Sequence, residues 1–399
     1  MSKNFRFTRM ELAGSLGDLG TILPLAVGMI MINNMNPIGI FIGVGLYYIL
    51  SGFYFKVTCP VEPMKVISAY AIATGITATQ MQASCLWIFA ILFIIGSVGL
   101  IDTIGRLIPK PVIRGVQLST GLLLLSQGIK LIAGTSTFQI MRKTAEPYLV
   151  VQHIGFLPIG LLLGALLGIM TLLLLENKRF PAAVMIVGVG LIIGFFWGNQ
   201  MEWTQLKMGL NLPSFLPNGL PTADDFSFAL LILVLPQIPM TIGNAVIANA
   251  DLSNEYFKEE SHRVTYKGLC LSMALANLGS FFIGGMPMCH GALGLASRYR
   301  FGARTAGSNL IIGSIFLIIA VVFGSQILLF INLLPMSTLG VLLVFAGAQL
   351  ALSILDMTTR KELFVVVFIV GVTLASNLAA GFLVGIVIAA ILRSEKISV

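Results

Sequence analysis

Long apolar stretches fill most of this chain and leave it few possible folds. Of its 399 residues, 57% are hydrophobic and only 10% are charged, whereas a soluble domain carries about 25% charged residues. Many of the stretches reach the roughly 20 residues that a helix needs to cross a bilayer. They do not alternate between polar and apolar residues, which excludes an outer-membrane barrel. The sequence therefore predicts an all-α polytopic membrane protein.

The chain divides into fourteen predicted transmembrane segments, several of them short. Their approximate ranges are 11–32, 36–55, 60–76, 82–101, 112–133, 155–175, 181–199, 226–249, 264–283, 288–297, 306–323, 326–354, 362–378 and 380–393. The longest polar stretches, near 135–153, 200–226 and 251–267, are predicted to be loops. Because the last segment ends close to Val399, no soluble regulatory domain is expected.

The net charge of +8 is explained by the positive-inside rule and says little about a substrate. With the N-terminus inside, nineteen of the 24 basic residues fall in the inner connections or the two tails, and Arg298 is counted among them. Arg142, Lys143 and Lys207 lie clearly outside. An even number of segments then places both termini in the cytoplasm. We expect a multi-pass protein of the inner (plasma) membrane, in contact with lipid and not with nucleic acid.

Three separate parts of the first half recur in the second half at a nearly constant offset of 226 or 227 residues. The matching pairs are Asp18 with Asn244, Pro60 with Pro287, and Gly121 with Gly347. Each repeat contains seven predicted segments, and an odd number turns the second repeat upside down relative to the first. The chain is therefore predicted to consist of 7+7 inverted repeats, residues 1–205 and 206–399, a design typical of secondary transporters.

Two apolar stretches are broken at the same position of each repeat. They read TCPVEPMK at 58–65 and GGMPMCHGALGLA at 284–296. Proline disfavours a regular helix just before itself, so each broken stretch should begin extended and continue as a half-helix. Inversion brings the two half-helices in from opposite faces, and their N-termini meet at mid-membrane. Unpaired N–H groups and partial positive charge then predict an anion site; a structural kink without a ligand is the alternative.

These motifs resemble the prokaryotic and plant molybdate transporter family, a branch of the sulfate permease superfamily. The resemblance rests on GDLGTILPL, PVEPMK and GGMPMCHGALGLA and covers essentially the whole chain; Leu293 stands where a second glycine is expected. It implies the sulfate- and uracil-permease fold, with a core domain (segments 1–4 and 8–11), a gate domain (segments 5–7 and 12–14) and a homodimer. It also implies molybdate as substrate, with sulfate as a close competitor; tungstate has the same shape and charge.

The substrate-binding candidates come from the first, third, eighth and tenth segments. They are Asp18, Thr21, Pro60, Val61, Glu62, Lys65, Gln237, Asn244, Pro287, Met288, Cys289, His290 and Gly291. Ionisable groups inside a membrane are costly and are functional candidates by default. Gln237 and Asn244 lie two helical turns apart, so they are predicted to share one face and to offer amide donors to the junction of the half-helices. Hydrogen bonding between helices is the alternative role.

Glu62, Asp18 and His290 are the proton-coupling candidates. Glu62 and His290 are each predicted to occupy the first turn of a half-helix. A carboxylate there repels a dianion unless Lys65 neutralises it, or unless it is protonated when the substrate binds, because burial disfavours its charge. Glu62 is then a proton-coupling residue; a cap for backbone N–H groups is the alternative.

Other functions are less compatible with the sequence. A nucleobase permease of the same fold is expected to carry a carboxylate in the middle of the eighth segment, where this chain has Gln237 and Asn244. An anion channel stays open as an alternative. HExxH and P-loop motifs are absent, which disfavours an enzyme or a primary pump. Met288 and Cys289 lack a matching cluster of metal ligands, so no metal or cofactor is expected.

Overall fold

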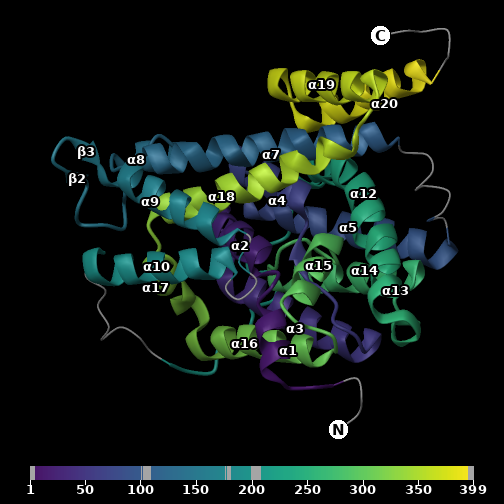
Figure 1. The fold of residues 1–399 in the computed structure, drawn as a ribbon, viewed down its shortest axis with the longest axis horizontal. Helices are drawn as coiled ribbons and strands as arrows, with labels where there is room; N and C mark the ends of the chain where they lie inside the picture. The colour runs from purple at the N-terminus through teal and green to yellow at the C-terminus, as the bar shows by residue number, and fades with distance from the viewer. Residues whose placement is uncertain are drawn as a thin grey trace.

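The computed structural model describes residues 5–99, 101, 109–175, 177, 181–198 and 208–393 (Figure 1). Within these residues, seven helices are long and apolar enough to cross a membrane, or eight if the bent pair α1–α2 counts as one span. The prediction of an all-helical, multi-span membrane protein is confirmed at this level. The predicted boundary between the repeats at 205 and 206, and Lys207, lie outside the described residues.

Over the described residues, the elements follow one another as a chain of helices with four very short strands. In the first half they are α1 (Arg9–Ser15), α2 (Leu19–Asn33), α3 (Pro37–Phe55), β1 (Glu62–Pro63), α4 (Lys65–Thr74), α5 (Ala78–Val98), α7 (Lys110–Ala133), α8 (Thr137–Arg142), β2 (His153–Ile154), β3 (Leu157–Pro158), α9 (Ile159–Leu174) and α10 (Ala182–Trp197).

Where the structure describes it, the second half contains two π-helical stretches and three 3₁₀ turns. Its elements are α11 (Ala223–Phe228), the π-helical η2 (Ala229–Val234), α12 (Leu235–Met240), the π-helical η3 (Thr241–Ala248), α13 (Asn249–Phe257), η4 (Lys258–Ser261), α14 (Tyr266–Ile283), β4 (Met288–Cys289), α15 (Ala292–Arg300), α16 (Gly307–Phe323), η5 (Gly324–Gln326), α17 (Ile327–Ile331), α18 (Met336–Ala351), η6 (Leu352–Asp356), α19 (Arg360–Ala375) and α20 (Leu378–Leu392).

Local signals in the sequence set where several helices begin. The Asn36 side chain accepts hydrogen bonds from the first two free N–H groups of α3, and Pro37 follows at the first helical position. α5 begins with a capping box between Thr77 and Gln80. The start of α18 is capped from a distance: buried Glu146 accepts from the Met336 and Ser337 N–H groups at 2.8 Å each. These caps satisfy backbone groups that lipid cannot satisfy.

Both broken stretches are extended and each leads into a short helix, as predicted. α4 begins at Lys65 and α15 begins at Ala292. Between them, β1 and β4 pair in antiparallel fashion, with Glu62 opposite Cys289. The pairing satisfies irregular backbone in the interior of the protein, where water is excluded.

Two buried asparagines complete this backbone pairing. The Asn309 side chain accepts from the Cys59 N–H at 3.1 Å and donates to the Cys59 carbonyl at 2.7 Å. Asn277 does the same for Met288, at 3.1 and 2.8 Å. Each amide therefore replaces one residue of a neighbouring strand.

The long helices pack as pairs from opposite halves of the chain: α3 with α16, α5 with α14, and α7 with α18. Figure 1 shows α7 and α18 running side by side, with α19 and α20 stacked outside α7. Glycines bring α7 and α18 close together, because a Cβ on Gly121 would lie 2.6 Å from the Gly347 carbonyl oxygen. Small residues at such contacts are the usual means of packing helices in membranes.

Candidate functional site

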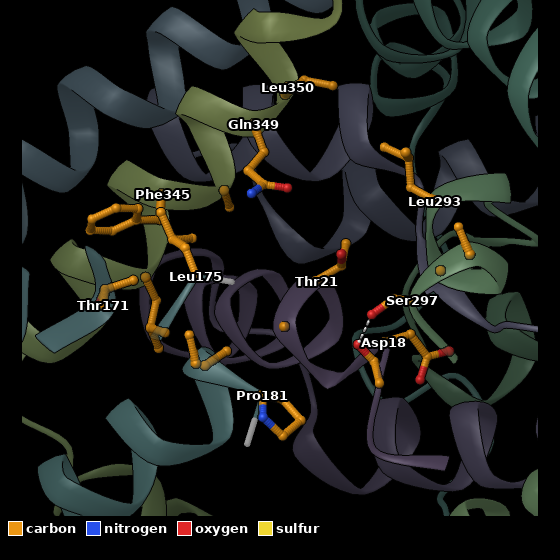
Figure 2. A pocket seen from close by; sticks show the side chains of 18 of the residues that line it. Asp18, Thr21, Thr171, Leu175, Pro181, Leu293, Ser297, Phe345, Gln349 and Leu350 are labelled. Atoms are coloured by element: carbon orange, nitrogen blue, oxygen red, sulfur yellow. Dashed lines mark hydrogen bonds between the residues drawn. The ribbon is translucent and has the colours of Figure 1, made fainter. Parts of the chain in front are cut away.

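A cavity of about 380 Å³ lies between two groups of helices. One wall comes from α1–α2, α4 and α15, and the opposite wall comes from α9, α10 and α18 (Figure 2). Most of its lining is apolar. The polar residues that line it are Asp18, Thr21, Lys65, Thr171, Asn177, Ser297, Arg300 and Gln349.

Lys65 brings a positive charge to this cavity from the first turn of α4. Its ammonium lies 3.0 Å from Oε2 of Glu62, which is fully buried, and the Lys65 side chain is 9% exposed. In the part of the chain that the structure describes, neither the ammonium nor the carboxylate oxygens make a well-aligned hydrogen bond, although the Thr21 hydroxyl is nearby. A buried ion pair repays its desolvation only when its remaining bonds are made. This pair is therefore open to a further polar partner.

The prediction that Glu62 lies in the first turn of a half-helix is wrong. Glu62 is not in the first turn of α4 but in β1, because the extended backbone continues through the Met64 N–H, which donates to the Pro287 carbonyl at 2.9 Å. Its carboxylate lies against the start of the opposite half-helix. A Cβ on Gly294 would lie 2.7 Å from Oε1, and one on Gly291 would collide with Oε2. A carboxylate of the protein itself thus sits beside the N-terminus of α15.

The first turn of α15 borders the same cavity. Leu293 and Gly294 line it, and the N-cap residue Gly291 has no side chain to bond the first N–H groups. The first N–H groups of a helix have no partner within the helix. By contrast, two N–H groups of α4 are already used, since Gln237 Oε1 accepts from Val66 and Ile67 at 3.0 and 3.2 Å.

Gln237 and Asn244 both reach the junction, but by different routes. Gln237 caps α4, and its amide also donates to the Thr241 hydroxyl at 2.9 Å. The Asn244 amide nitrogen lies 3.6 Å from the position of a Cβ on Gly291, at the start of α15. The backbone is π-helical from Thr241 to Ala248, so the regular spacing behind the predicted shared face does not hold.

The expectation that His290 occupies the first turn of α15 is also wrong. His290 precedes the N-cap Gly291, and its ring bonds within the protein interior. Its Nδ1 lies 2.7 Å from the Pro60 carbonyl oxygen, so Nδ1 carries a proton and donates. Nε2 lies 2.7 Å from the Tyr47 hydroxyl and 3.0 Å from the Ser272 hydroxyl. His290 therefore connects the two broken stretches and does not line the cavity.

The remaining candidates form the paired strands and their approaches. Val61, Met288 and Cys289 are buried, and Pro60 packs against the start of α15. Pro287 accepts the hydrogen bond from Met64. These residues shape the backbone of the site. Among the described residues, no group of three His, Cys, Asp or Glu side chains could hold a metal ion.

Arg298 was missed as a site residue and wrongly counted as an inner-loop cation. It is fully buried in α15, and its Nη1 lies 3.2 Å from Oδ1 of Asp18. The guanidinium also donates to Thr58, Ser308 and Asn309, at 2.9, 3.0 and 2.8 Å. A carboxylate inside the first segment requires a counter-charge, and that was the available signal. Arg300 and Arg304 follow it closely in the sequence, so the segment resembles a basic loop.

Asp18 is consequently well satisfied. Besides Arg298, the Tyr48 hydroxyl donates to its Oδ2 at 2.6 Å. The Asp18–Arg298 ion pair links α15 to the bend between α1 and α2 at one edge of the cavity.

Comparison with known proteins identifies relatives over nearly the whole chain. A family described as "Molybdate transporter of MFS superfamily" matches residues 10–124 and 229–350. Molybdate transporter 2 of Arabidopsis thaliana is 32% identical, with 96% of this chain and 87% of the relative covered. Molybdate transporter 1 of Chlamydomonas reinhardtii is 30% identical, with 96% and 91% covered.

Solved structures share the fold at low sequence identity. The transmembrane domain of the cyanobacterial bicarbonate transporter BicA has a TM-score of 0.67 and 17% identity, with 97% of this chain and 98% of that chain covered. SLC26A9 has a TM-score of 0.68 and 13% identity, with 96% of this chain and 65% of that longer chain covered. The chain therefore has the fold of these membrane domains.

Proposed function

The chain belongs to the molybdate transporter family, and we propose that it is a secondary active transporter that imports molybdate with protons by alternating access. Membership in this family makes it a membrane anion transporter and not an enzyme. The observation that carries the proposal is Lys65: a nearly buried cation that lacks aligned hydrogen bonds and faces a cavity at the start of a half-helix. Sulfate and tungstate, which are also tetrahedral dianions, are the expected competitors.

We propose that fourteen segments in two inverted repeats build the fold. The register of β1 and β4 supports this, because Glu62 faces Cys289 and the two residues are themselves one repeat apart. At the repeat offset, α3 corresponds to α14 and α5 corresponds to α16. The contact of α3 with α16 is therefore the symmetry equivalent of the contact of α14 with α5. The elements around the paired strands form the proposed core domain, and α7, α9, α10 and α18–α20 form the proposed gate.

Contacts between distant loops support the proposed topology, with both termini in the cytoplasm of a plasma-membrane protein. On the proposed inner side, the Glu11 carboxylate accepts from the Thr305 N–H at 3.0 Å. On the same side, Nη2 of Arg114 lies 2.6 Å from Oδ2 of Asp356. On the proposed outer side, Glu146 bonds the start of α18. Each contact joins loops that the positive-inside rule puts on one side.

The cavity opens inward in this scheme. It is lined by Leu175, Pro181 and Arg300, which lie at helix ends on the proposed inner side. We propose that the oxyanion binds at its deep end, between the Lys65 ammonium and the first turn of α15. There the partial positive charge of a helix N-terminus adds to the ammonium. Glu62, beside both, carries the coupled proton, and a homodimer in the lipid bilayer is the proposed assembly.

Uptake of radiolabelled molybdate into proteoliposomes tests the function. We expect saturable uptake that an inwardly directed proton gradient drives, and competition by tungstate and sulfate but not by uracil or chloride. Uptake of uracil without molybdate would overturn the oxyanion assignment. Flux that neither saturates nor responds to the proton gradient would instead identify an anion channel.

A further inference from the structure

The polar side chains around the cavity differ in how far they are already engaged. Ser297 donates to the Gly17 carbonyl at 2.6 Å, and Thr171 donates to the Leu167 carbonyl at 2.7 Å. Asn177 and Arg300 also interact with other residues, and Asp18 is held by Arg298. A ligand in the cavity therefore has to find its partners among the groups that remain.

On one wall these are Lys65, whose pairing with Glu62 at 3.0 Å lacks aligned hydrogen bonds, and Thr21, which lies beside the same carboxylate. On the other wall the remaining group is Gln349. Gln349 is exposed to the cavity from α18, and within the described residues no hydrogen bond is formed by its amide. Figure 2 shows it pointing from α18 into the space that Thr21 borders from the opposite side. Its neighbours on that wall, Phe345 and Leu350, are apolar. On α18, the amide of Gln349 thus stands among apolar neighbours.

We propose that Gln349 is a specificity-determining residue, whose amide N–H groups donate to an oxygen of the bound oxyanion from the gate side. This inference rests on the proposed function. The oxygens of a tetrahedral oxyanion only accept hydrogen bonds, and an amide offers two donors without adding charge. A second lysine here would hold the dianion more tightly but would also hinder its release.

Hydrogen-bond donors on two opposing walls also allow the site to discriminate between anions by size. α18 is held against α7 by close glycine contacts, so Gln349 belongs to the gate wall, while Lys65 belongs to α4. Molybdate and tungstate are larger than sulfate and reach both walls more easily. Hydrogen bonds weaken steeply when they are stretched or bent. A site that bonds its substrate from both sides therefore favours the larger anions, and a site with Lys65 alone discriminates less.

Competition measurements on reconstituted variants test this role. Gln349→Leu removes the donors at similar volume, Gln349→Asn keeps the amide but shortens it, and Gln349→Glu places a negative charge against the anion. Thr171→Val is the matched control, because it lies on the same wall and its hydroxyl is already bonded within α9. The inhibition constants of unlabelled molybdate and sulfate are measured against labelled molybdate for each variant.

We expect Gln349→Leu to raise the inhibition constant of molybdate roughly tenfold, the effect of losing one hydrogen bond to a charged group, and that of sulfate clearly less. Gln349→Asn should fall between Gln349→Leu and the wild type, Gln349→Glu should bind neither anion, and Thr171→Val should match the wild type. Equal changes for both anions, or no change, would overturn the proposal. Failure of the wild-type protein to transport molybdate would refute the proposed function instead, so the two failures are distinguishable.

Discussion

Two buried carboxylates, Asp18 and Glu62, each pair with a cation, and the difference between the two pairs separates structure from function. Arg298 and Tyr48 both bond Asp18, and the remaining guanidinium N–H groups are also used. The Glu62–Lys65 pair is close but poorly bonded, and it borders the cavity. Satisfied buried pairs fix a structure, whereas a partly satisfied pair is costly unless a ligand or a proton completes it. We therefore propose Glu62 ahead of Asp18 as the coupling residue.

Replacing Glu62 with Gln tests this assignment. An ionised Glu62 about 5 Å from one negative charge, at an effective dielectric near 20, costs about 3 kcal/mol. A dianion doubles this penalty, and in the proposed coupling a proton on the carboxyl group removes it when the substrate binds. Glu62→Gln should keep molybdate binding, remove the pH dependence of that binding, and abolish proton-driven accumulation. Equilibrium binding and uptake at several pH values provide the measurement.

Asp18→Asn is the parallel variant. It should weaken the buried contact with Arg298 and lower thermal stability, since breaking a buried pair leaves an uncompensated charge. Proton-driven accumulation at the wild-type level in Glu62→Gln would show that Glu62 is a structural group, and the coupling role would then pass to Asp18 or His290.

At the scale of elements, the two half-helices were predictable and their side-chain contacts were not. Proline and glycine act on their own backbone, so Pro60 and Pro287 mark the extended stretches directly in the sequence. Arg298 reaches Asp18 across 280 residues, and His290 reaches Pro60 across 230. No local pattern encodes such pairs. Glu62 lies in β1 and not in α4 because a second broken stretch pairs with it. The junction of the half-helices was therefore predictable from the sequence, whereas the positions of Glu62 and Arg298 were not.

The close approach of α15 to Glu62 predicts that Gly294 tolerates no side chain. A Cβ there would lie 2.7 Å from Oε1 of Glu62 and 2.9 Å from Cβ of Pro60. Gly294→Ala should push the carboxylate away from the half-helix, reduce molybdate uptake severely and lower the melting temperature.

Gly168→Ala in α9 is the matched control, because no atom lies within 4 Å of the added Cβ. It should leave uptake unchanged and, since alanine favours a helix over glycine, should not lower the melting temperature. Wild-type uptake in Gly294→Ala would show that the packing between α15 and Glu62 is not required for transport.

At the scale of the whole molecule, the fold separates a wall that carries the charges from a wall that is almost apolar. Lys65, Asp18 and the start of α15 lie on the first wall, and α18 forms much of the second. In the proposed alternating-access cycle, the two walls would move relative to each other and expose the anion to one side at a time. An apolar surface suits this movement, because it forms no strong bonds that must break at each turnover.

Accessibility to a membrane-impermeant thiol reagent tests this arrangement. Phe156, at the exposed tip between β2 and β3, lies on the proposed outer side, and Asn177, after α9, lies on the proposed inner side. The four native cysteines are buried, so the wild-type protein provides a low background. In intact cells Phe156→Cys should react and Asn177→Cys should not, whereas in inside-out vesicles the pattern should reverse.

Ser297→Cys, inside the cavity, should react only in inside-out vesicles and should be protected by molybdate. Labelling of Phe156→Cys and Asn177→Cys from the same side would refute the inverted topology, and Ser297→Cys that reacts only from outside would show that the cavity opens outward.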